Sequence, residues 1–318
     1  MEYRLKLPII LLTIAGVLLT TYNIVNYDSE MSPSTSTLLP ALRTLGDTIT
    51  VTDPKDRLVF IGDVHGQYNE FKEMLDTKIG ALDSHTTVVL LGDFLVKGPD
   101  SVKMLDYVSE HQDRVRFVFG NHEVLLFLAY VREELSLPDH ILFATDKQFP
   151  PHSFKPPKKI HKELVKQLGG ERMHKLAALG SASLRFDLAL TNETLFAVHA
   201  GMLPGDFLEK DQVPPIAELV DMKYVNQEDW TQSAREEEDV KHSKRWYKLW
   251  DDCDKKYRNI TVLYGHDAKK GLNLREHTKG LDSGCVRGGK LSALEYNYDA
   301  KTKKYTTTLH QVQARTHI

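Results

Sequence analysis

Three apolar strand patterns alternate with helical patterns in the first half of this chain, and each strand runs directly into a glycine and polar side chains. The strands are expected at residues 58–63, 87–93 and 115–121, and their endings read GDVHG, GDFLVKG and GNHE. A β-α-β-α-β order predicts an α/β fold around a central sheet. Ligands bind beyond the carboxyl ends of strands in such sheets, so we expect the three endings to meet in space.

Two later strand patterns end in the same way. TLFAVHAG ends near His199, and TVLYGHD ends near His266. Near the C-terminus, KGLDSGCVRGGKLSALEYN predicts one or two antiparallel strands, and YNYDAKTKKYTTTLHQV predicts a hairpin with its turn near residues 299–302. The five strand ends together offer oxygen and imidazole side chains, namely Asp63, His65, Asp93, Asn121, His122, His199 and His266.

These side chains indicate a metal site when they are taken together. Any one of the histidines alone is more often a hydrogen-bonded core or loop residue, but chance does not place so many at successive strand ends. Oxygen and imidazole donors without thiolates suit zinc, manganese or iron. The chain has two cysteines, Cys253 and Cys285, which excludes a cysteine-rich zinc site. One carboxylate can bridge two metal ions about 3.5–4 Å apart, and such a pair assists displacement at phosphorus.

The motif order GDxHG, GDxxxxG, GNHE, HAG and GH resembles the calcineurin-like metallophosphoesterases of the PPP superfamily, over about residues 57–295. This resemblance implies an α+β sandwich of two mixed sheets flanked by helices. It also implies two divalent metal ions, with zinc favoured over manganese, cobalt or magnesium. His122 matches the family's general acid, which protonates the leaving oxygen while a metal-bound hydroxide attacks phosphorus. The motifs assign two ligand sets that share Asp93: Asp63, His65 and Asp93 for one metal, and Asp93, Asn121, His199 and His266 for the other.

The second motif departs from the family's commonest pattern, GDxVDRG. Val96 stands where an aspartate usually orients the catalytic histidine, so the sequence leaves the orientation of His122 unexplained. Lys97 stands where an arginine usually holds phosphate, and it replaces a bidentate fork with a point charge that still binds phosphate. Lys97 followed by GPDS, and the later LDSGCVRGGKLSALE, resemble the ApaH-like branch, whose members include enzymes that cleave dinucleoside polyphosphates.

A proline- and lysine-rich insert lies between the third helix and His199. Lysines gather between residues 147 and 166, and the prolines predict that the first half of this stretch is extended. An extended basic strip beside a two-metal centre suits a linear polyanion, whereas a solvated loop is the alternative interpretation. The net charge of −3 provides no global field for nucleic acid, and we expect no such partner. The candidate phosphate-binding residues are Lys97, Asn121, Lys155, Lys158 and Lys159.

The N-terminal segment is expected to lie outside the globular domain. Residues 7–25 carry no charged side chain, and a run of this length can span a bilayer as a signal anchor behind a short cytosolic tail, residues 1–6. Basic residues before the run and acidic residues after it place the rest of the chain on the far side of the membrane. A cleaved signal peptide is the alternative. We expect a linker over residues 26–50 and a single enzyme domain over residues 51–318.

Asn192 and Asn259 begin Asn-x-Thr sequons, which are candidate glycosylation sites in a lumenal domain. The anchor, the linker and the WYKLWDD segment resemble membrane-anchored fungal members of the ApaH-like branch that cleave polyphosphate in the vacuole. The resemblance therefore implies a vacuolar enzyme that hydrolyses phosphoanhydride bonds inside inorganic polyphosphate chains.

Three other functions are alternatives. One is hydrolysis of dinucleoside polyphosphates or capped nucleotides, and another is protein Ser/Thr phosphatase activity, which Val96 and Lys97 disfavour. The third is a lumenal pseudo-enzyme that binds phosphate chains without cleaving them. The intact ligand set and His122 argue against it, because a binding protein needs no general acid.

Overall fold

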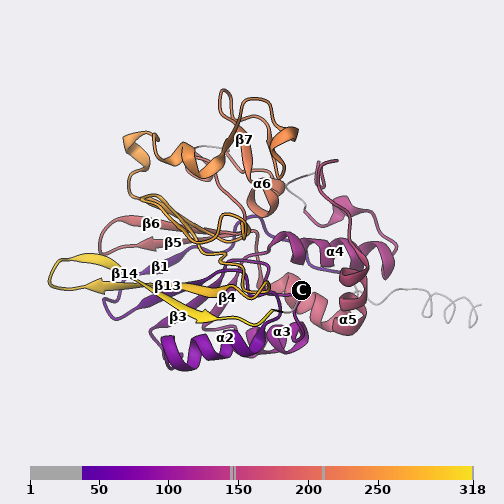
Figure 1. The fold of residues 1–318 in the computed structure, drawn as a ribbon, viewed down its shortest axis with the longest axis horizontal. Helices are drawn as coiled ribbons and strands as arrows, with labels where there is room; N and C mark the ends of the chain where they lie inside the picture. Colours follow the sequence, from indigo (N-terminus) through magenta and orange to yellow (C-terminus); the bar gives the residue numbers. More distant parts are fainter. Residues whose placement is uncertain (1–37, 144–145, 147, 210–211, 317–318) are drawn as a thin grey trace, which may run out of the picture. The chain divides into compact units, whose positions relative to one another are not determined.

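The computed structural model describes residues 38–143, 146, 148–209 and 212–316. Over these residues the chain forms two large mixed sheets, one small sheet and flanking helices (Figure 1). The expected anchor at residues 7–25 lies outside the described residues. Within the described part, no helix is both long enough and apolar enough to cross a membrane.

The first large sheet contains the predicted β-α-β-α-β strands. Three of its strands, β2, β3 and β4, run parallel, and a long antiparallel hairpin is added beside β2. The expected central strands and the C-terminal hairpin are therefore confirmed. Across the sheet the strands are β14 (Lys304–Gln313), β13 (Lys290–Asp299), β2 (Arg57–Ile61), β3 (Thr86–Leu90) and β4 (Val115–Phe117).

The second large sheet holds the two later strands that end near histidines. Its strands β6 and β10 are parallel neighbours, so their carboxyl ends lie together. In order, its strands are β1 (Ile49–Val51), β5 (Ser183–Leu188), β6 (Glu193–Val198), β10 (Ile260–Tyr264), β12 (Thr278–Gly280) and β11 (Asn273–Leu274). The small sheet is formed by β8 (Ser233–Ala234), β7 (Tyr224–Asn226) and β9 (Ser243–Arg245).

Helices connect and cover the sheets. In Figure 1, α2 and α3 lie along the outer face of the sheet that contains β3 and β4. The α-helices are α2 (Tyr68–Met74), which continues into a π-helical turn (Leu75–Ile79), α3 (Ser101–Glu110), α4 (Asn121–Glu133), α5 (Lys159–Leu179) and α6 (Ile216–Asp221). Short 3₁₀ helices occur at Asp139–Ile141, Glu237–Asp239, Trp246–Trp250 and Lys255–Tyr257.

Strand β2 shows how alternation builds the core. Phe60 packs towards the second sheet, where its ring meets Phe186 of β5 edge-to-face with centroids 5.4 Å apart. Val59 and Ile61 belong to the apolar cluster on the other side, together with Phe71 of α2. Since successive side chains of a strand point to opposite faces, β2 is buried on both sides. The polar residues that follow β2 therefore come at the rim of a rigid core.

The globular domain begins earlier than expected. Leu42 is 3% exposed, and its backbone N–H donates to the carbonyl of Leu142 at 2.9 Å. Strand β1 pairs with β5, and residues Leu39–Ile318 form one compact unit. Residues 39–50 thus belong to the domain rather than to the linker, because their apolar side chains and backbone groups are satisfied against it.

The basic insert divides into two parts. Residues 150–158 contain no helix, as the prolines predicted, and the second half forms the start of α5 at Lys159. The extended part therefore ends at Lys158, and the later lysines lie on a helix.

Candidate active site

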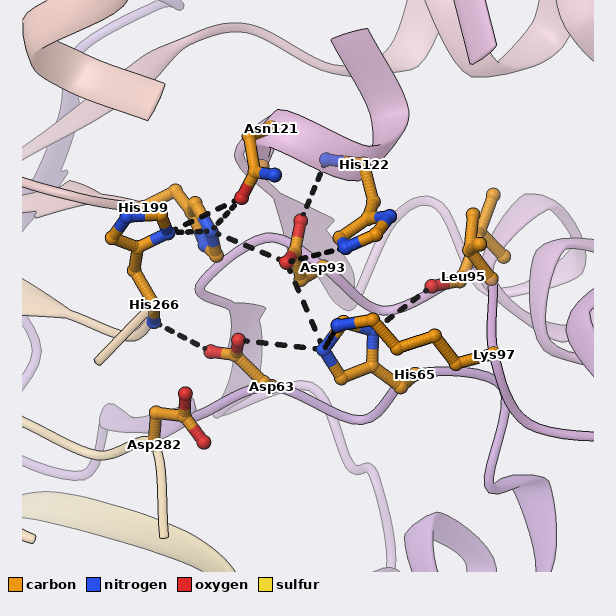
Figure 2. Close-up of polar contacts among 12 residues, drawn as sticks. Asp63, His65, Asp93, Leu95, Lys97, Asn121, His122, His199, His266 and Asp282 are labelled. Carbon is orange, nitrogen blue, oxygen red and sulfur yellow. Dashed lines mark hydrogen bonds and ion pairs between the residues drawn. The ribbon is translucent and has the colours of Figure 1, made fainter. Parts of the chain in front are cut away.

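All seven strand-end side chains meet at the carboxyl ends of the parallel strands, as the strand-end argument predicted (Figure 2). Asp63 and His65 follow β2, Asp93 follows β3, Asn121 and His122 form the first turn of α4, His199 follows β6 and His266 follows β10. Six of them are buried and His122 is partly buried. Two sheets and one helix start therefore hold the cluster.

Three of these residues have an uncommon backbone conformation. The φ angles of His65, Asp93 and His266 are 53°, 47° and 71°, in the left-handed region that few residues other than glycine adopt. Each lies where the chain leaves a strand and turns sharply. Left-handed residues cluster at functional sites, where the surrounding structure must hold them in place.

Two glycines allow the carboxylates to lie against the backbone. A Cβ atom on Gly120 would lie 2.2 Å from Oδ1 of Asp93, and one on Gly265 would lie 2.1 Å from Oδ1 of Asp63. Neither distance is possible between real atoms. The glycines of GNHE and GHD are therefore required by the close approach of the two aspartates.

Asp93 lies between three imidazoles, as Figure 2 shows. Its Oδ2 atom is 3.7 Å from Nε2 of His65, 3.5 Å from Nε2 of His199 and 3.9 Å from Nε2 of His122. Nε2 of His65 is also 3.8 Å from Oδ2 of Asp63. These atoms form a first group of possible ligands around Asp63, His65 and Asp93.

A second group lies on the other side of Asp93. Oδ1 of Asn121 is 3.3 Å from Nε2 of His199 and 3.2 Å from Nδ1 of His266. The two imidazole nitrogens are 3.1 Å apart. Asp93, Asn121, His199 and His266 thus direct one oxygen or nitrogen each into the same small volume.

The spacing of these donors fits divalent metal ions. Tetrahedral ligands at zinc distances of about 2.0–2.2 Å lie roughly 3.4 Å from one another. The donor atoms of the two groups are 3.1–3.8 Å apart where the structure gives their separation. Carboxylate, amide and imidazole donors suit zinc or manganese. The residues therefore fit two cations that share Asp93.

The electrostatics of the site also favour cations. Burial and the charge of Asp282 raise the pKa of Asp63 well above its usual value. Burial lowers the pKa of His199, but the charges of Asp93 and Asp63 outweigh it and raise this pKa to about 10. Burial and the charge of Lys97 lower the pKa of His65 to about 3, which keeps its ring neutral with a lone pair on one nitrogen. Crowded buried carboxylates require positive charge nearby.

Asp282 was not predicted as a site residue. It is 5% exposed, lines the cavity over the site and accepts a hydrogen bond from the backbone N–H of Gly284 at 3.0 Å. It lies in the LDSG segment, where only the family resemblance drew attention to the sequence.

Glu123 anchors the loop that carries Asp93, a role that the sequence analysis missed. Its carboxylate is fully buried and accepts hydrogen bonds from the backbone N–H groups of Asp93 at 2.8 Å, Leu95 at 3.0 Å and Gly120 at 2.8 Å. A glutamate three residues after a helix cap is the signature of a capping box. That signal in GNHE could have identified Glu123.

His122 is oriented by another histidine. Its Nδ1 atom is 2.9 Å from Nε2 of His161, which comes from the first turn of α5 and is 1% exposed. Its backbone N–H donates to Oδ1 of Asp93 at 2.9 Å. Burial lowers the pKa of His122 well below its usual value, although Asp93 opposes the shift. The partner that the sequence left unidentified thus comes from the basic insert.

A cavity of about 200 Å³ lies over the carboxylates and has a basic wall. The basic side chains that line it are Lys97, Lys155, Lys223, Arg235, Lys269 and Arg287. A second cavity of about 320 Å³ shares Lys97, Lys155 and Arg235 with the first and adds Lys158. Its wall also includes the apolar side chains of Leu125, Phe154 and Ile160.

The structure separates the lysines that were predicted to bind phosphate. Lys97 lies deepest, with its Nζ 2.9 Å from Nε2 of His65. Lys155 pairs with Glu236 at 2.9 Å at the cavity wall. Lys159 is exposed, pairs with Glu163 at 3.5 Å along α5 and lines neither cavity, so its assignment as a phosphate-binding residue stays a prediction.

Arg235 is a further basic residue that the sequence did not single out. Its guanidinium pairs with Asp221 and lies 3.5 Å from Nε2 of His266, between the two cavities. It directly follows β8, in a stretch of sequence that carries no motif. The structure alone brings it to the site.

The family profile described as Calcineurin-like phosphoesterase matches residues 56–300. The chain belongs to this family. All seven strand-end residues of this calcineurin-like phosphoesterase lie within the matched range, and so do Glu123 and His161.

Relatives of this calcineurin-like phosphoesterase have related activities. The zinc-dependent endopolyphosphatase of Saccharomyces cerevisiae is 41% identical over 312 residues, which cover 96% of this chain and 95% of that protein. A symmetrical bis(5'-nucleosyl)-tetraphosphatase of Nitrosospira multiformis is 29% identical over 280 residues, 74% of this chain and 90% of that protein. The crystal structure of a proposed diadenosine tetraphosphatase shares the fold, with a TM-score of 0.57, 22% identity, and coverage of 83% of this chain and 97% of that one.

The role of Glu123 is tested by the substitution Glu123→Gln. Glutamine has one acceptor oxygen, so at least one of the three buried backbone N–H groups loses its partner, and we expect the free energy of unfolding to fall by about 1–3 kcal/mol. Urea unfolding followed by tryptophan fluorescence measures this change. Glu134→Gln, at the exposed end of α4, is the control and should leave the unfolding midpoint unchanged. Equal midpoints for both variants would contradict the anchoring role.

Proposed function

We propose that this chain is a metal-dependent hydrolase of phosphoanhydride bonds, an endopolyphosphatase that cleaves inorganic polyphosphate internally with zinc as the favoured metal. The observation that carries the proposal is the position of the shared ligand set, which lies at the floor of a cavity with a basic wall. The activity named for the Saccharomyces cerevisiae relative supports the substrate and the metal.

The proposed roles follow the geometry. One cation would be held by Asp63, His65 and Asp93, and the other by Asp93, Asn121, His199 and His266. Divalent cations at such ligands polarise a phosphoryl oxygen and neutralise the charge that develops on it. His122 directs Nε2 to the same place and would donate to the leaving oxygen. Lys97, Arg235 and the amide of Asn121 would bind the oxygens of the phosphate.

Internal cleavage is supported by the two adjoining cavities. They share Lys97, Lys155 and Arg235, so a polyanion can extend from one cavity into the other across the reacting phosphate. Polyphosphate carries about one charge per phosphate, and basic side chains on both sides of the scissile bond would hold a continuous chain rather than its end.

Asp93→Asn tests the metal centre. Asparagine keeps the shape of the side chain but removes the charge shared by both ligand groups. We expect the wild-type chain to bind two divalent metal ions and the variant to lose most of this metal and nearly all activity, as measured by elemental analysis and phosphate release. Asp56→Asn is the control, since Asp53, Asp56 and His85 form a separate surface group of possible ligands. Full metal content and activity in Asp93→Asn would contradict the assignment.

A gel of long-chain polyphosphate over time tests the substrate and the cleavage mode. Internal attack produces intermediate lengths early, whereas exclusive release of free phosphate from slowly shortening chains would contradict it. We expect Lys155→Ala combined with Lys158→Ala to raise KM for long chains several-fold without changing KM for a small aryl phosphate. Lys159→Ala is the matched control, because this lysine lines neither cavity, and it should behave as wild type.

A second candidate is hydrolysis of dinucleoside polyphosphates. The apolar wall of the second cavity, formed by Leu125, Phe154 and Ile160, could accept a base, and the Nitrosospira multiformis relative is named for this activity. Cleavage of diadenosine tetraphosphate by a preparation that leaves polyphosphate intact would establish this function in place of the first.

We also propose that residues 7–25 anchor the domain on the lumenal side of the vacuolar membrane, with glycans at Asn192 and Asn259. The sequence pattern of the anchor supports this topology, and both asparagines are exposed. The expected results are protection of the domain from protease in intact vesicles and a loss of mass on deglycosylation that Asn192→Gln combined with Asn259→Gln abolishes. Digestion of the domain from the cytosolic side would reverse the proposed topology.

A further inference from the structure

The hydrogen bonds of His161 define which of its nitrogens carries the proton. Nδ1 of His161 lies 3.0 Å from the backbone nitrogen of Lys158, the residue that precedes α5, and accepts a hydrogen bond from it. A backbone N–H can only donate, so Nδ1 of His161 is an acceptor without a proton. Neutral His161 therefore carries its proton on Nε2.

This proton in turn defines the state of His122. Nε2 of His161 lies 2.9 Å from Nδ1 of His122, and the planes of the two rings are inclined by only 23°. Since Nε2 of His161 carries a proton, it donates to Nδ1 of His122, which must offer its lone pair. Neutral His122 then holds its own proton on Nε2, the atom that faces Asp93 and the cavity.

A carboxylate partner would have the opposite effect. An aspartate beside Nδ1 accepts a hydrogen bond from the ring Nδ1–H and stabilises the imidazolium, so the histidine can give up a whole proton from Nε2. His161 supplies no negative charge and occupies the lone pair of Nδ1. Among the described residues, His161 is the side chain that hydrogen bonds to Nδ1 of His122. His122 is thereby prepared as a neutral hydrogen-bond donor.

We propose that His161 is a positioning residue that fixes the Nε2–H tautomer of His122 and thereby favours phosphoanhydrides over alkyl phosphoesters. This inference rests on the proposed function, because it explains the selectivity of the same site. It assigns a specificity-determining role to a residue from the basic insert rather than to the strand ends.

The selectivity follows from the charge on the leaving group. Hydrolysis adds the oxygen of water to phosphorus and breaks the bridging P–O bond, whose electron pair stays on the leaving oxygen; the protons of water pass to solvent or to the products. A phosphate group titrates near pH 6, at about the second pKa of phosphate esters, so it leaves as a stable anion that needs only a hydrogen bond. An alkoxide needs a whole proton, and a neutral imidazole is a poor source of one.

Two substitutions of His161 that are isosteric with each other distinguish a neutral hydrogen-bond donor from a carboxylate at this position. In His161→Gln, the carbonyl oxygen can accept from Lys158 and the amide NH₂ can donate to Nδ1 of His122, as His161 does. In His161→Glu, one oxygen can accept from Lys158 while the other accepts a hydrogen bond from Nδ1–H of His122. Both residues are favoured at the third position of a helix, so α5 should form in either variant. His174→Gln, near the other end of α5, is the control.

The first measurement is the ¹⁵N NMR spectrum of the histidine rings in the metal-free protein, with His122 assigned from its absence in His122→Ala. We expect the ring proton of His122 on Nε2 in the wild type, in His161→Gln and in His174→Gln. In His161→Glu we expect it on Nδ1. A proton on Nδ1 in the wild type, or the same tautomer in the Gln and Glu variants, would overturn the proposal.

The second measurement is the ratio of kcat/KM for an alkyl phosphate to kcat/KM for polyphosphate. We expect His161→Gln to stay within about threefold of the wild-type ratio and His161→Glu to raise it by about tenfold or more, since general acid catalysis contributes about 10²–10⁴ to such reactions. The increase should vanish when His122→Ala is added. Equal ratios in the Gln and Glu variants would overturn the proposed selectivity.

The two measurements also separate this inference from the proposed function. If the wild type cleaves no polyphosphate with any divalent metal, the proposed function fails, and the NMR spectra still decide whether His161 fixes the tautomer. If polyphosphate is cleaved internally but substitutions of His161 change neither the His122 tautomer nor the ratio of kcat/KM values, the proposed function stands and the role of His161 fails.

Discussion

The arrangement of the site depends on the carboxylate of Asp93. Its Oδ1 accepts the backbone N–H of His122 in the first turn of α4, and its own backbone N–H donates to Glu123. A helix N-terminus favours a negative charge, so α4 both positions this carboxylate and stabilises it. Oδ2 is then left to face the imidazoles of His65, His122 and His199. One fixed side chain thus sets the separation of the two ligand groups.

The surrounding core keeps the strained backbone of the site in place. His65, Asp93 and His266 have left-handed backbone conformations, which would relax if the strands could shift. The strands cannot shift, because β2 and β3 are buried between the second sheet and the helices. Glu123 satisfies three backbone donors that have no strand or helix partner. Strain at a site can persist when rigid elements hold it from several directions.

The insert between α4 and β5 supplies side chains of the site that the strand ends do not provide. Through Lys155 and Lys158 it adds charge to the cavity walls, and through His161 it reaches the ring of His122. The start of α5 is suited to this second task, because the cap hydrogen bond from Lys158 fixes the His161 ring. The charge at the cavity wall and the contact with the His122 ring thus come from the same short segment.

The sequence by itself determined the central strands, the convergence of their polar ends and the membership of the family. These features depend on local patterns, since period-two alternation and strand-end glycines are written in consecutive residues. It was also sufficient to identify the seven side chains that meet. Parallel strands within each sheet end at one edge, and the family resemblance joined the two sets of strand ends.

Only the tertiary structure decided which other residues reach the site. His161 and Arg235 come from segments without a motif, and Asp282 comes from the LDSG segment, to which the sequence analysis gave no role in the site. Lys159 is next to Lys158 in sequence but points along the outside of α5. The start of the domain near Leu42 likewise depends on a contact with Leu142. Such contacts join residues far apart in the chain, and their formation depends on the packing of whole elements rather than on any local pattern.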